Sequence, residues 1–193
     1  MSLDHPLRRL LQPDWVVPGT LAELPLAALL ERPSKPIRAL VLDVDRTLLP
    51  RRQTLVPESM RLWLQAASQQ VPIHLLSNNP SRLRIGAVAA LFNLPFTNAA
   101  GKPRRSALRR VLAELELPPS QVALIGDRLF TDVMAGNRLG LFTVLVKPID
   151  PNGQPCQRDR LQKLELRLAR MLGTNLGANL GANLGTNLGT KLT

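Results

Sequence analysis

The chain has 193 residues, of which 45% are hydrophobic and 20% charged, and this composition excludes a wholly disordered protein. Its 25 Lys and Arg outnumber 14 Asp and Glu, and the formal net charge of +11 favours polyanionic or membrane-surface partners. No stretch approaches the roughly 18 apolar residues that span a bilayer, and the first residues do not resemble a signal peptide. Because the single cysteine, Cys156, has no partner for an internal disulfide, we expect a cytoplasmic protein, with peripheral membrane contact left open.

The composition also divides the chain into three segments. Residues 1–36 are rich in proline, and Thr20 and Glu23 have capping-box spacing at the start of a predicted helix, TLAELPLAALLE. Residues 173–193 repeat a four-residue unit that is too short for a known solenoid and whose glycines oppose helix. We expect an N-terminal extension that packs on the core, a folded domain at 37–172 and a disordered low-complexity tail. Docking of the tail leucines on a partner is the alternative.

The folded domain alternates between strand-like and helix-like patterns. Short apolar runs bounded by turn residues predict strands at 37–44, 71–77, 95–100, 121–127 and 141–146. Apolar residues at helical spacing predict helices at 57–70, 81–93, 103–117, about 131–138 and about 158–172. Such alternation predicts an α/β fold of three layers, in which helices cover both faces of a parallel, Rossmann-like sheet.

The last predicted helix, RDRLQKLELRLARML, is both basic and amphipathic. Its cations are Arg158, Arg160, Lys163, Arg167 and Arg170. Its large apolar residues are Leu161, Leu164, Leu168, Met171 and Leu172. Because amphipathic helices usually turn their apolar face to a core, we expect these apolar residues to cover the sheet and the cations to stay outside.

Polar side chains follow three of the predicted strands. They are Asp43 and Asp45 after the first strand, Ser77, Asn78 and Asn79 after the second, and Asp127 after the fourth. Lys102 directly precedes the helix predicted at 103–117, whose first residue is expected to be Pro103. Ligands of doubly wound sheets bind beyond the carboxyl ends of the strands, so these groups should meet at one edge. Carboxylates beside a lysine and a hydroxyl predict a site for a hard cation next to a site for a phosphate. A bound cation would also offset the free-energy cost of placing carboxylates at the end of a buried apolar strand.

Four short motifs occur in a fixed order along the chain: DVDRTL, LLSNN, GKP and GDRLFTDV. In this order they resemble the four motifs of the haloacid dehalogenase (HAD) superfamily of phosphatases. The stretch LQPDWVV and the short spacings look most like subclass IIIA, the YqeG-type group, which is related to phosphatidylglycerophosphate phosphatases. The resemblance covers about residues 8–170 and leaves out the repeat tail. It implies a HAD-type phosphatase without a cap domain.

The resemblance implies a role for each acid. Asp43 would be the nucleophile that forms an aspartyl-phosphate, and Asp45 the general acid and base. Mg²⁺ would be held by the Asp43 carboxylate, the Asp45 backbone carbonyl and Asp127, with Asp132 nearby or acting through water. The plainer alternatives are turn acids at Asp43 and Asp45, and for Asp132 a carboxylate that favours a helix N-terminus.

The other motif residues would bind the phosphoryl group. Ser77, the backbone amides after it (Asn78) and Lys102 would hold its oxygens. Ser77 and Asn78 could instead form a turn, and Lys102 could be a solvated surface lysine. Arg46 departs from the small or amide residue that is more usual at its place, and its cation would either weaken Mg²⁺ binding or contact phosphate.

The spacing of the motifs bears on the substrate. Only a loop, a helix and a strand fit between Thr47 and Ser77, and only a helix and an extended piece between Ser77 and Lys102, so neither gap holds a cap. An open site suits a large or surface-bound phosphomonoester, such as one on a protein terminus, a nucleic-acid end or a lipid headgroup. The resemblance to relatives of phosphatidylglycerophosphate phosphatases, together with the basic surface, implies a lipid phosphate such as phosphatidylglycerophosphate, presented by an anionic membrane. Two alternatives stay open: a nucleic-acid or ribosome-binding module that has lost turnover, with Arg46 as its sign, and a soluble nucleotide or sugar-phosphate phosphatase.

Overall fold

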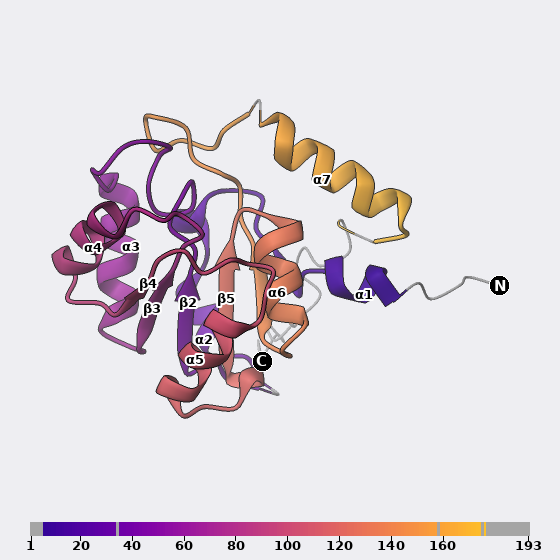
Figure 1. The fold of residues 1–193 in the computed structure, drawn as a ribbon, viewed down its shortest axis with the longest axis horizontal. Helices are drawn as coiled ribbons and strands as arrows, with labels where there is room; N and C mark the ends of the chain where they lie inside the picture. The colour runs from indigo at the N-terminus through magenta and orange to yellow at the C-terminus, as the bar shows by residue number, and fades with distance from the viewer. Residues whose placement is uncertain (1–5, 34, 158, 175, 177–193) are drawn as a thin grey trace, which may run out of the picture.

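A computed structural model describes residues 6–33, 35–157, 159–174 and 176 (Figure 1). Its centre is a six-stranded sheet in the order β1-β6-β5-β2-β3-β4, in which every neighbouring pair is parallel. The strands are β1 (Trp15–Val16), β2 (Ala39–Leu42), β3 (Ile73–Leu76), β4 (Phe96–Thr97), β5 (Val122–Gly126) and β6 (Phe142–Leu145). The parallel α/β fold that the sequence predicts is therefore confirmed. Within the described ranges, no helix is both long and apolar enough to cross a membrane.

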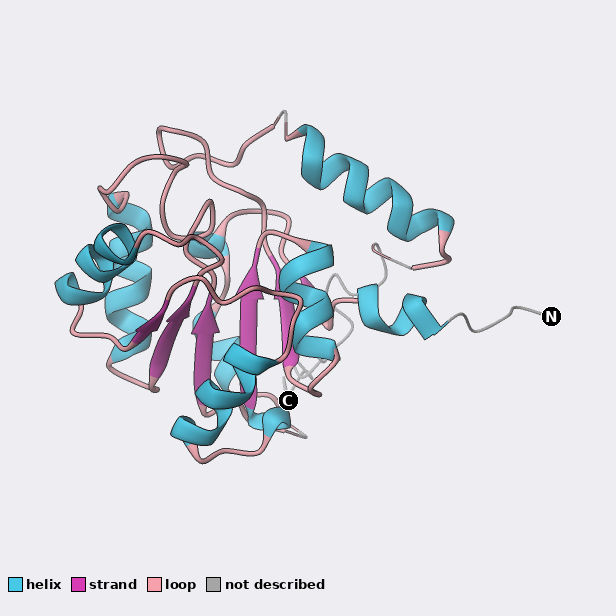
Figure 2. Cartoon of the chain, viewed as in Figure 1, coloured by secondary structure: helices cyan, strands magenta, loops and turns pink. Residues whose placement is uncertain are grey.

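Helices cover both faces of this sheet (Figure 2). They are α1 (Pro6–Leu11), η1 (Leu21–Glu23), α2 (Leu26–Leu30), α3 (Glu58–Ser68), α4 (Arg82–Leu91), α5 (Ser106–Leu115), η2 (Pro119–Gln121), η3 (Leu129–Val133), α6 (Met134–Asn137) and α7 (Arg160–Met171). Because side chains alternate along a strand, Leu40 and Leu42 pack with α2, α3 and α4, whereas Ala39 and Val41 pack with α5 and α6. The core thus forms two apolar layers, and the carboxyl ends of the strands stay open at one edge.

The N-terminal segment adds an edge strand, which the sequence analysis did not assign. β1 pairs in parallel with β6, with Trp15 opposite Val144. The side-chain amide of Asn137 donates to the carbonyls of Leu10 (3.0 Å) and Gln12 (2.8 Å), which fixes the approach to this strand. The one helix predicted after Thr20 is divided into η1 and α2. Leu24 between them is extended (φ −74°, ψ 118°) because a residue before proline avoids the helical region.

The helix after Lys102 begins later than predicted. α5 starts at Ser106, not at Pro103, and the peptide bond between Lys102 and Pro103 is cis. A first helical residue at Pro103 would require the Lys102 carbonyl to accept a helical hydrogen bond. That carbonyl accepts instead from the side chain of Asn78 (2.9 Å), and the Arg104 amide donates to Gly101 (2.9 Å) in a tight turn. The prediction for Pro103 is therefore wrong.

The last helix also packs differently from the prediction. α7 packs mainly against η3, and it reaches the sheet only at the end of β6, where Leu145 lies in one apolar cluster with Ala169. Its buried residues are Gln162, Glu165 and Ala169. Its exposed residues include Leu161, Leu164, Leu168 and Met171. Only Leu172, of the apolar residues expected to cover the sheet, packs against an apolar cluster. The predicted repeat tail lies outside the described residues apart from its first positions, Gly173, Thr174 and Leu176.

Candidate active site

Asp43 follows β2 at the carboxyl edge of the sheet and is 7% exposed. The ammonium of Lys102 lies 2.6 Å from its Oδ1, and the hydroxyl of Thr47 donates to its Oδ2 (3.3 Å). The same ammonium donates to the carbonyl of Leu76 at the end of β3 (2.9 Å). Both oxygens of Asp43 are therefore held in place by groups from two different motifs.

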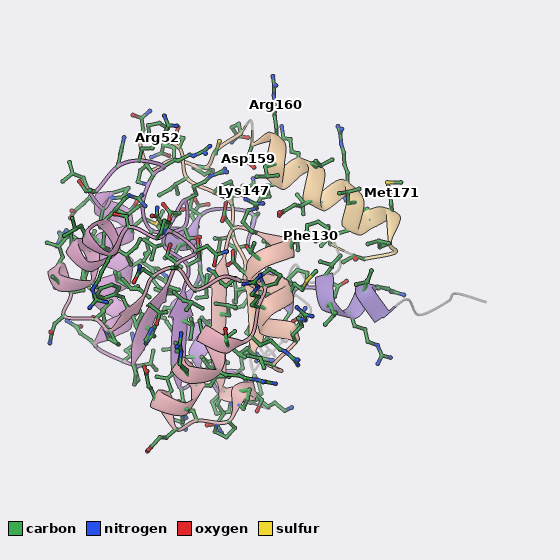
Figure 3. The ribbon with its side chains drawn as sticks, viewed as in Figure 1. Arg52, Phe130, Lys147, Asp159, Arg160 and Met171 are labelled. Atoms are coloured by element: carbon green, nitrogen blue, oxygen red, sulfur yellow. The ribbon has the colours of Figure 1, made fainter. Side chains whose placement is uncertain are left out.

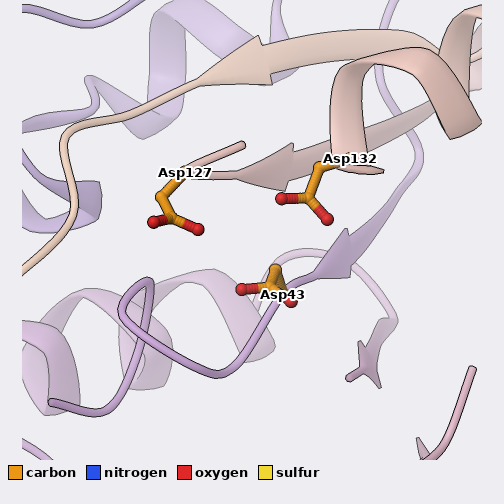
Figure 4. A group of neighbouring side chains, drawn as sticks. All are labelled: Asp43, Asp127 and Asp132. Carbon is orange, nitrogen blue, oxygen red and sulfur yellow. The ribbon is translucent and has the colours of Figure 1, made fainter. Parts of the chain in front are cut away.

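Two further acids come from the end of β5 and the turn that follows it. Oxygen atoms of Asp43, Asp127 and Asp132 all lie within 4.8 Å of one another, and the three carboxylates point toward a common centre (Figure 4). Lys102 Nζ lies 2.6 Å from Asp132 Oδ1, so this lysine bridges two of the three acids. Gly126 is required here, because any side chain at its position would overlap the carboxylate of Asp132.

A wide helical turn sets the position of Asp132. η3 is a π-helix, in which the amide of Val133 donates to the carbonyl of Arg128 (3.2 Å), five residues earlier. The amide of Arg128 in turn donates to Asp132 Oδ2 (3.2 Å). Such turns add a residue to a helix and often occur at functional sites. This turn directs Asp132, 2% exposed, toward Lys102, a placement that a simple acid at a helix N-terminus would not require.

Burial governs the charges of the cluster. Burial raises the pKa of Asp43 to about 7, although Lys102 lowers it, and the charge of Asp132 adds to the rise. Burial, and next the charges of Asp43 and Asp132, also raise the pKa of Asp127 well above its ordinary value. Burial lowers the pKa of Lys102, but Asp132 and Asp43 together raise it more, so it stays an ammonium. One buried ammonium therefore faces three buried acids, and the cluster attracts a further cation.

The acid cluster suits a hard divalent cation. Asp127 Oδ2 is buried without a hydrogen-bond partner among the described residues, and the nearby cation, Arg46 Nε, is 3.8 Å away. All the side-chain donors of the cluster are carboxylate oxygens, which Mg²⁺ and Ca²⁺ prefer over softer ligands. An orphaned buried oxygen beside two other carboxylates is the arrangement that such an ion would complete.

The side chain of Asp45 points away from this cluster. It accepts a hydrogen bond from the hydroxyl of Ser77 (3.1 Å) and forms an ion pair with Arg84 of α4. Arg84 also donates to the carbonyls of Gln53 (2.9 Å) and Pro50 (3.1 Å), so it ties the loop after β2 to α4. Ser77 and Asp45, expected at one site, are thus brought together, whereas the carboxylate of Asp45 is not a member of the metal-binding group in the described residues.

Asn78 holds the Lys102 backbone. Its side-chain oxygen accepts from the Lys102 amide (2.7 Å) and its nitrogen donates to the Lys102 carbonyl (2.9 Å). The amide of Asn79 donates to the hydroxyl of Ser77 (3.0 Å). The polar cluster after β3 therefore aligns Lys102 and Ser77 toward the two acids of the DVD motif.

Arg46 turns toward the last helix. Its backbone has a positive φ of 71°, and its guanidinium forms an ion pair with Asp159, the N-cap residue of α7. Arg46 Nε also lies 3.8 Å from Asp127 Oδ2, but the charge of the guanidinium is paired with Asp159. The expected direct conflict between the Arg46 cation and a metal ion is therefore reduced by Asp159.

Sequence reasoning missed several residues that build the site. Thr47 lies within the DVDRTL motif, so its contact with Asp43 could have been expected from the motif alone. Arg84, Gln162 and Glu165 carry no comparable signal. They lie on helices far along the chain from the groups they bind, and only the fold brings them together.

Comparisons with known proteins agree with this geometry. A family model described as HAD-hydrolase-like matches residues 99–148. The chain is 31% identical to Probable phosphatase YqeG of Bacillus subtilis (strain 168) over 114 residues, 58% of this chain and 66% of that protein. It is 28% identical over 127 residues to Phosphatidylglycerophosphate phosphatase 1, chloroplastic, of Chlamydomonas reinhardtii, which is 61% of this chain and 47% of that protein. The chain thus spans between about half and just under two thirds of these relatives.

Solved structures include a 2-haloacid dehalogenase from Pseudomonas syringae pv. Tomato DC3000, which aligns over 70% of this chain and 99% of its own at 14% identity and a TM-score of 0.46. The sequence matches, the order of the four motifs and the all-parallel sheet all indicate similarity to HAD-like hydrolases. The chain is similar to HAD-like hydrolases over residues 99–148, and over 58% of its length it resembles the YqeG-type phosphatases.

Proposed function

We propose that the protein is a Mg²⁺-dependent phosphomonoester hydrolase that works through an aspartyl-phosphate on Asp43. The observation that carries this proposal is the Lys102 ammonium, 2.6 Å from both Asp43 and Asp132, at the carboxyl edge of the sheet. A buried carboxylate held on both oxygens is a preorganised nucleophile, and a fixed ammonium beside it favours a phosphoryl group with its negative charge.

In the first half-reaction a carboxylate oxygen of Asp43 attacks phosphorus, and the bond from phosphorus to the ester oxygen breaks. Asp45 acts as general acid and transfers a proton to the leaving oxygen, so that a neutral alcohol departs. Ser77 and Arg84 set the direction of the Asp45 carboxyl group through their contacts with its two oxygens. Lys102 and the hydroxyl of Ser77 hold the phosphoryl oxygens.

In the second half-reaction Asp45, now a carboxylate, removes a proton from water. The water oxygen attacks phosphorus of the aspartyl-phosphate, which releases phosphate and restores the Asp43 carboxylate. The ion pair with Arg84 favours the carboxylate form of Asp45, which is the form that acts as the base in this step.

The metal site would be formed by the Asp43 carboxylate, the Asp45 backbone carbonyl and Asp127, with Asp132 binding directly or through water. A bound Mg²⁺ supplies positive charge that offsets the repulsion between the nucleophile and the phosphate. The cluster geometry and the orphaned Asp127 oxygen support this assignment.

We further propose a lipid phosphate of the phosphatidylglycerophosphate class as substrate. The name of the Chlamydomonas relative supports this class, as does the position of the site at the carboxyl edge of the sheet. Among the described residues, α3 alone separates β2 from β3 and α4 with β4 separates β3 from Lys102, so no cap covers the edge of the sheet. An uncapped site can reach a phosphate that projects from a surface.

The binding-module alternative rested on Arg46 as a sign of lost turnover. Its ion pair with Asp159 gives this residue a structural partner, and the acids and Lys102 that turnover requires are all present. We therefore retain hydrolysis as the single proposed function.

A phosphate-release assay tests the proposal. We expect release from an aryl phosphate that needs Mg²⁺, stops with a chelator and is absent from Asp43→Asn, and faster hydrolysis of phosphatidylglycerophosphate than of glycerol 3-phosphate. Equal rates on the two natural substrates would refute the lipid assignment and leave a soluble phosphatase. No release from any of them, with salt-steep binding to RNA, would refute hydrolysis itself.

A further inference from the structure

The helix α7 exposes a stripe of large apolar side chains. Its inward face buries two polar side chains, Gln162 and Glu165, beside Leu166 and Ala169, which pack in an apolar cluster. This outer stripe consists of Leu161 (44% exposed), Leu164 (51%), Leu168 (42%) and Met171 (83%). Their spacing of three, four and three residues places them along one side of the helix.

Gln162 and Glu165 are turned inward because they bind groups at the active-site edge of the sheet. The side-chain amide of Gln162 donates to the carbonyls of Asp127 (2.8 Å) and Val146 (3.0 Å). Glu165 accepts from the guanidinium of Arg128 (2.6 Å) and from the amide of Leu129 (3.0 Å). These buried backbone groups would otherwise lack partners at considerable cost. Satisfying them fixes the rotation of α7, and the outer stripe is left in solvent as a result.

A row of cations runs beside the outer stripe. Arg160, Lys163, Arg167 and Arg170 are all exposed and lie on the side of the stripe away from the protein. Figure 3 shows Arg160 extending outward from the start of α7 and Met171 at its far end. An exposed apolar stripe flanked by long cationic side chains matches an interfacial helix, whose apolar side enters the headgroup region while Lys and Arg reach the phosphates.

The position of α7 connects this surface with the active site. The helix lies at the edge of the molecule where the strands end, and Arg52, in the loop after β2, projects at the same edge (Figures 2 and 3). Through Gln162 the helix is bonded to Asp127, one of the three clustered acids. A flat surface that contacts the outer side of α7 would therefore lie at the edge of the sheet that carries the acid cluster.

We propose that α7 is a docking helix for the surface of an anionic lipid bilayer, with its outer stripe in the headgroup region and its cations on lipid phosphates. Charge complementarity favours an anionic bilayer as the partner, because the outer stripe is bordered by four cations and the chain has a formal net charge of +11. The inference rests on the proposed function only in one respect, namely that the bilayer would present the lipid phosphate substrate. The docking itself does not require turnover.

Vesicle binding by the full chain tests the proposal. We expect binding to vesicles of phosphatidylglycerol and phosphatidylcholine at low salt, and little binding to pure phosphatidylcholine or at high salt. The double variant Leu164→Gln/Leu168→Gln should bind the anionic vesicles at least about tenfold more weakly, because apolar burial is lost. The variant Lys163→Gln/Arg167→Gln should lose about fivefold for each cation.

Matched controls separate the outer stripe from general surface effects. Leu83→Gln/Leu91→Gln removes two leucines of α4 that are 90% and 68% exposed, and Arg109→Gln/Arg110→Gln removes two exposed cations of α5. Both should bind vesicles within about twofold of wild type, since neither touches α7. All α7 variants should keep the wild-type melting temperature and aryl phosphatase rate, because the substituted side chains are exposed.

Repeating the binding measurement with Asp43→Asn separates docking from catalysis, since that variant should bind vesicles normally without turning over substrate. The proposal is overturned if the leucine variant binds anionic vesicles as tightly as wild type, or if neutral vesicles bind equally well. Self-association of the free protein that the leucine variant abolishes, without any vesicle binding, would also overturn it and assign the outer stripe to a second copy of the chain.

Discussion

The ammonium of Lys102 lies 2.6 Å from Asp43 although 59 residues separate them in the chain. The contact forms because β2 and β3 are neighbours in the sheet and because Asn78, just after β3, binds the backbone of Lys102. It joins the proposed nucleophile to the proposed phosphate-binding cation. It also makes the stability of the fold depend on the chemistry of the site.

Replacing Lys102 tests that dependence. Lys102→Met leaves three buried acids without their ammonium, so we expect metal-free protein to lose about 3–5 kcal/mol of unfolding free energy. Turnover should fall by at least about a hundredfold, because a fixed donor to the phosphoryl group is lost. Denaturant unfolding in a chelator and an aryl phosphatase assay measure the two effects. Lys35→Met, at an exposed lysine, is the control, and equal stability of the two variants would contradict the ion-pair account.

Asp127 tests the metal site. Asp127→Asn removes one of three mutually repelling acids, so the metal-free variant should melt at a higher temperature than wild type. Mg²⁺ at about a hundred times its Kd should stabilise wild type by about 2.7 kcal/mol and the variant far less. Thermal unfolding with and without Mg²⁺ provides the measurement. A full Mg²⁺ shift in the variant would show that the ion binds elsewhere.

The raised pKa of Asp43 predicts a pH dependence of stability. Burial moves this pKa from 3.8 to about 7, so the folded state holds the proton more tightly than the unfolded chain does. Ionising Asp43 therefore lowers stability as the pH rises from about 4 to about 7, and the penalty is constant above that range. Asp43→Asn lacks this penalty, so its stability advantage over wild type should grow between these pH values, by about 4 kcal/mol at most.

Denaturant unfolding in a chelator, at several pH values, measures this advantage. Glu31→Gln, at an exposed carboxylate, should show no such trend. An advantage of Asp43→Asn that stays constant from pH 4 to pH 8 would mean that Asp43 keeps an ordinary pKa in the folded protein.

Arg84 tests the positioning of Asp45. Arg84→Gln removes the ion pair with Asp45 and the hydrogen bonds to the 50–53 loop, so kcat should fall by roughly tenfold with a smaller change in KM. Arg84→Lys keeps the charge but loses the planar donor fork, and should be intermediate. Arg82→Gln, which removes an arginine that packs over Phe96, serves as the control. Steady-state kinetics on an aryl phosphate with wild-type kcat in both Arg84 variants would remove Arg84 from the account.

The sequence predicted the structure correctly where a residue pattern is compatible with only one arrangement. Apolar runs such as 121–127 predicted buried parallel strands, and acids directly after them predicted a site at the strand ends, because the topology of such sheets leaves few alternatives. Helical periodicity in α7 was less informative. It shows that one side is apolar but not which side meets the protein, and the carbonyls of Asp127 and Val146 decided that question by binding Gln162.

Backbone acceptors carry no sequence signature, which explains the other differences. The start of α5 moved because Asn78 occupies the Lys102 carbonyl, and Arg84 entered the site because Pro50 and Gln53 offer carbonyls beside Asp45. The charge of Arg46 could be seen in the sequence, but its pairing with Asp159 depended on where α7 begins. Contacts of this kind follow from the folded arrangement alone.

The covalent intermediate gives the most direct test of the central claim. Asp45→Asn should form the aspartyl-phosphate but hydrolyse it slowly, because the base for water is lost. Mass spectrometry of this variant after mixing with Mg²⁺ and an aryl phosphate should show one phosphoryl group, on the peptide that contains Asp43. The double variant Asp43→Asn/Asp45→Asn should show none. Phosphate release by Asp43→Asn at the wild-type rate, or a phosphoryl group on another residue, would contradict the account.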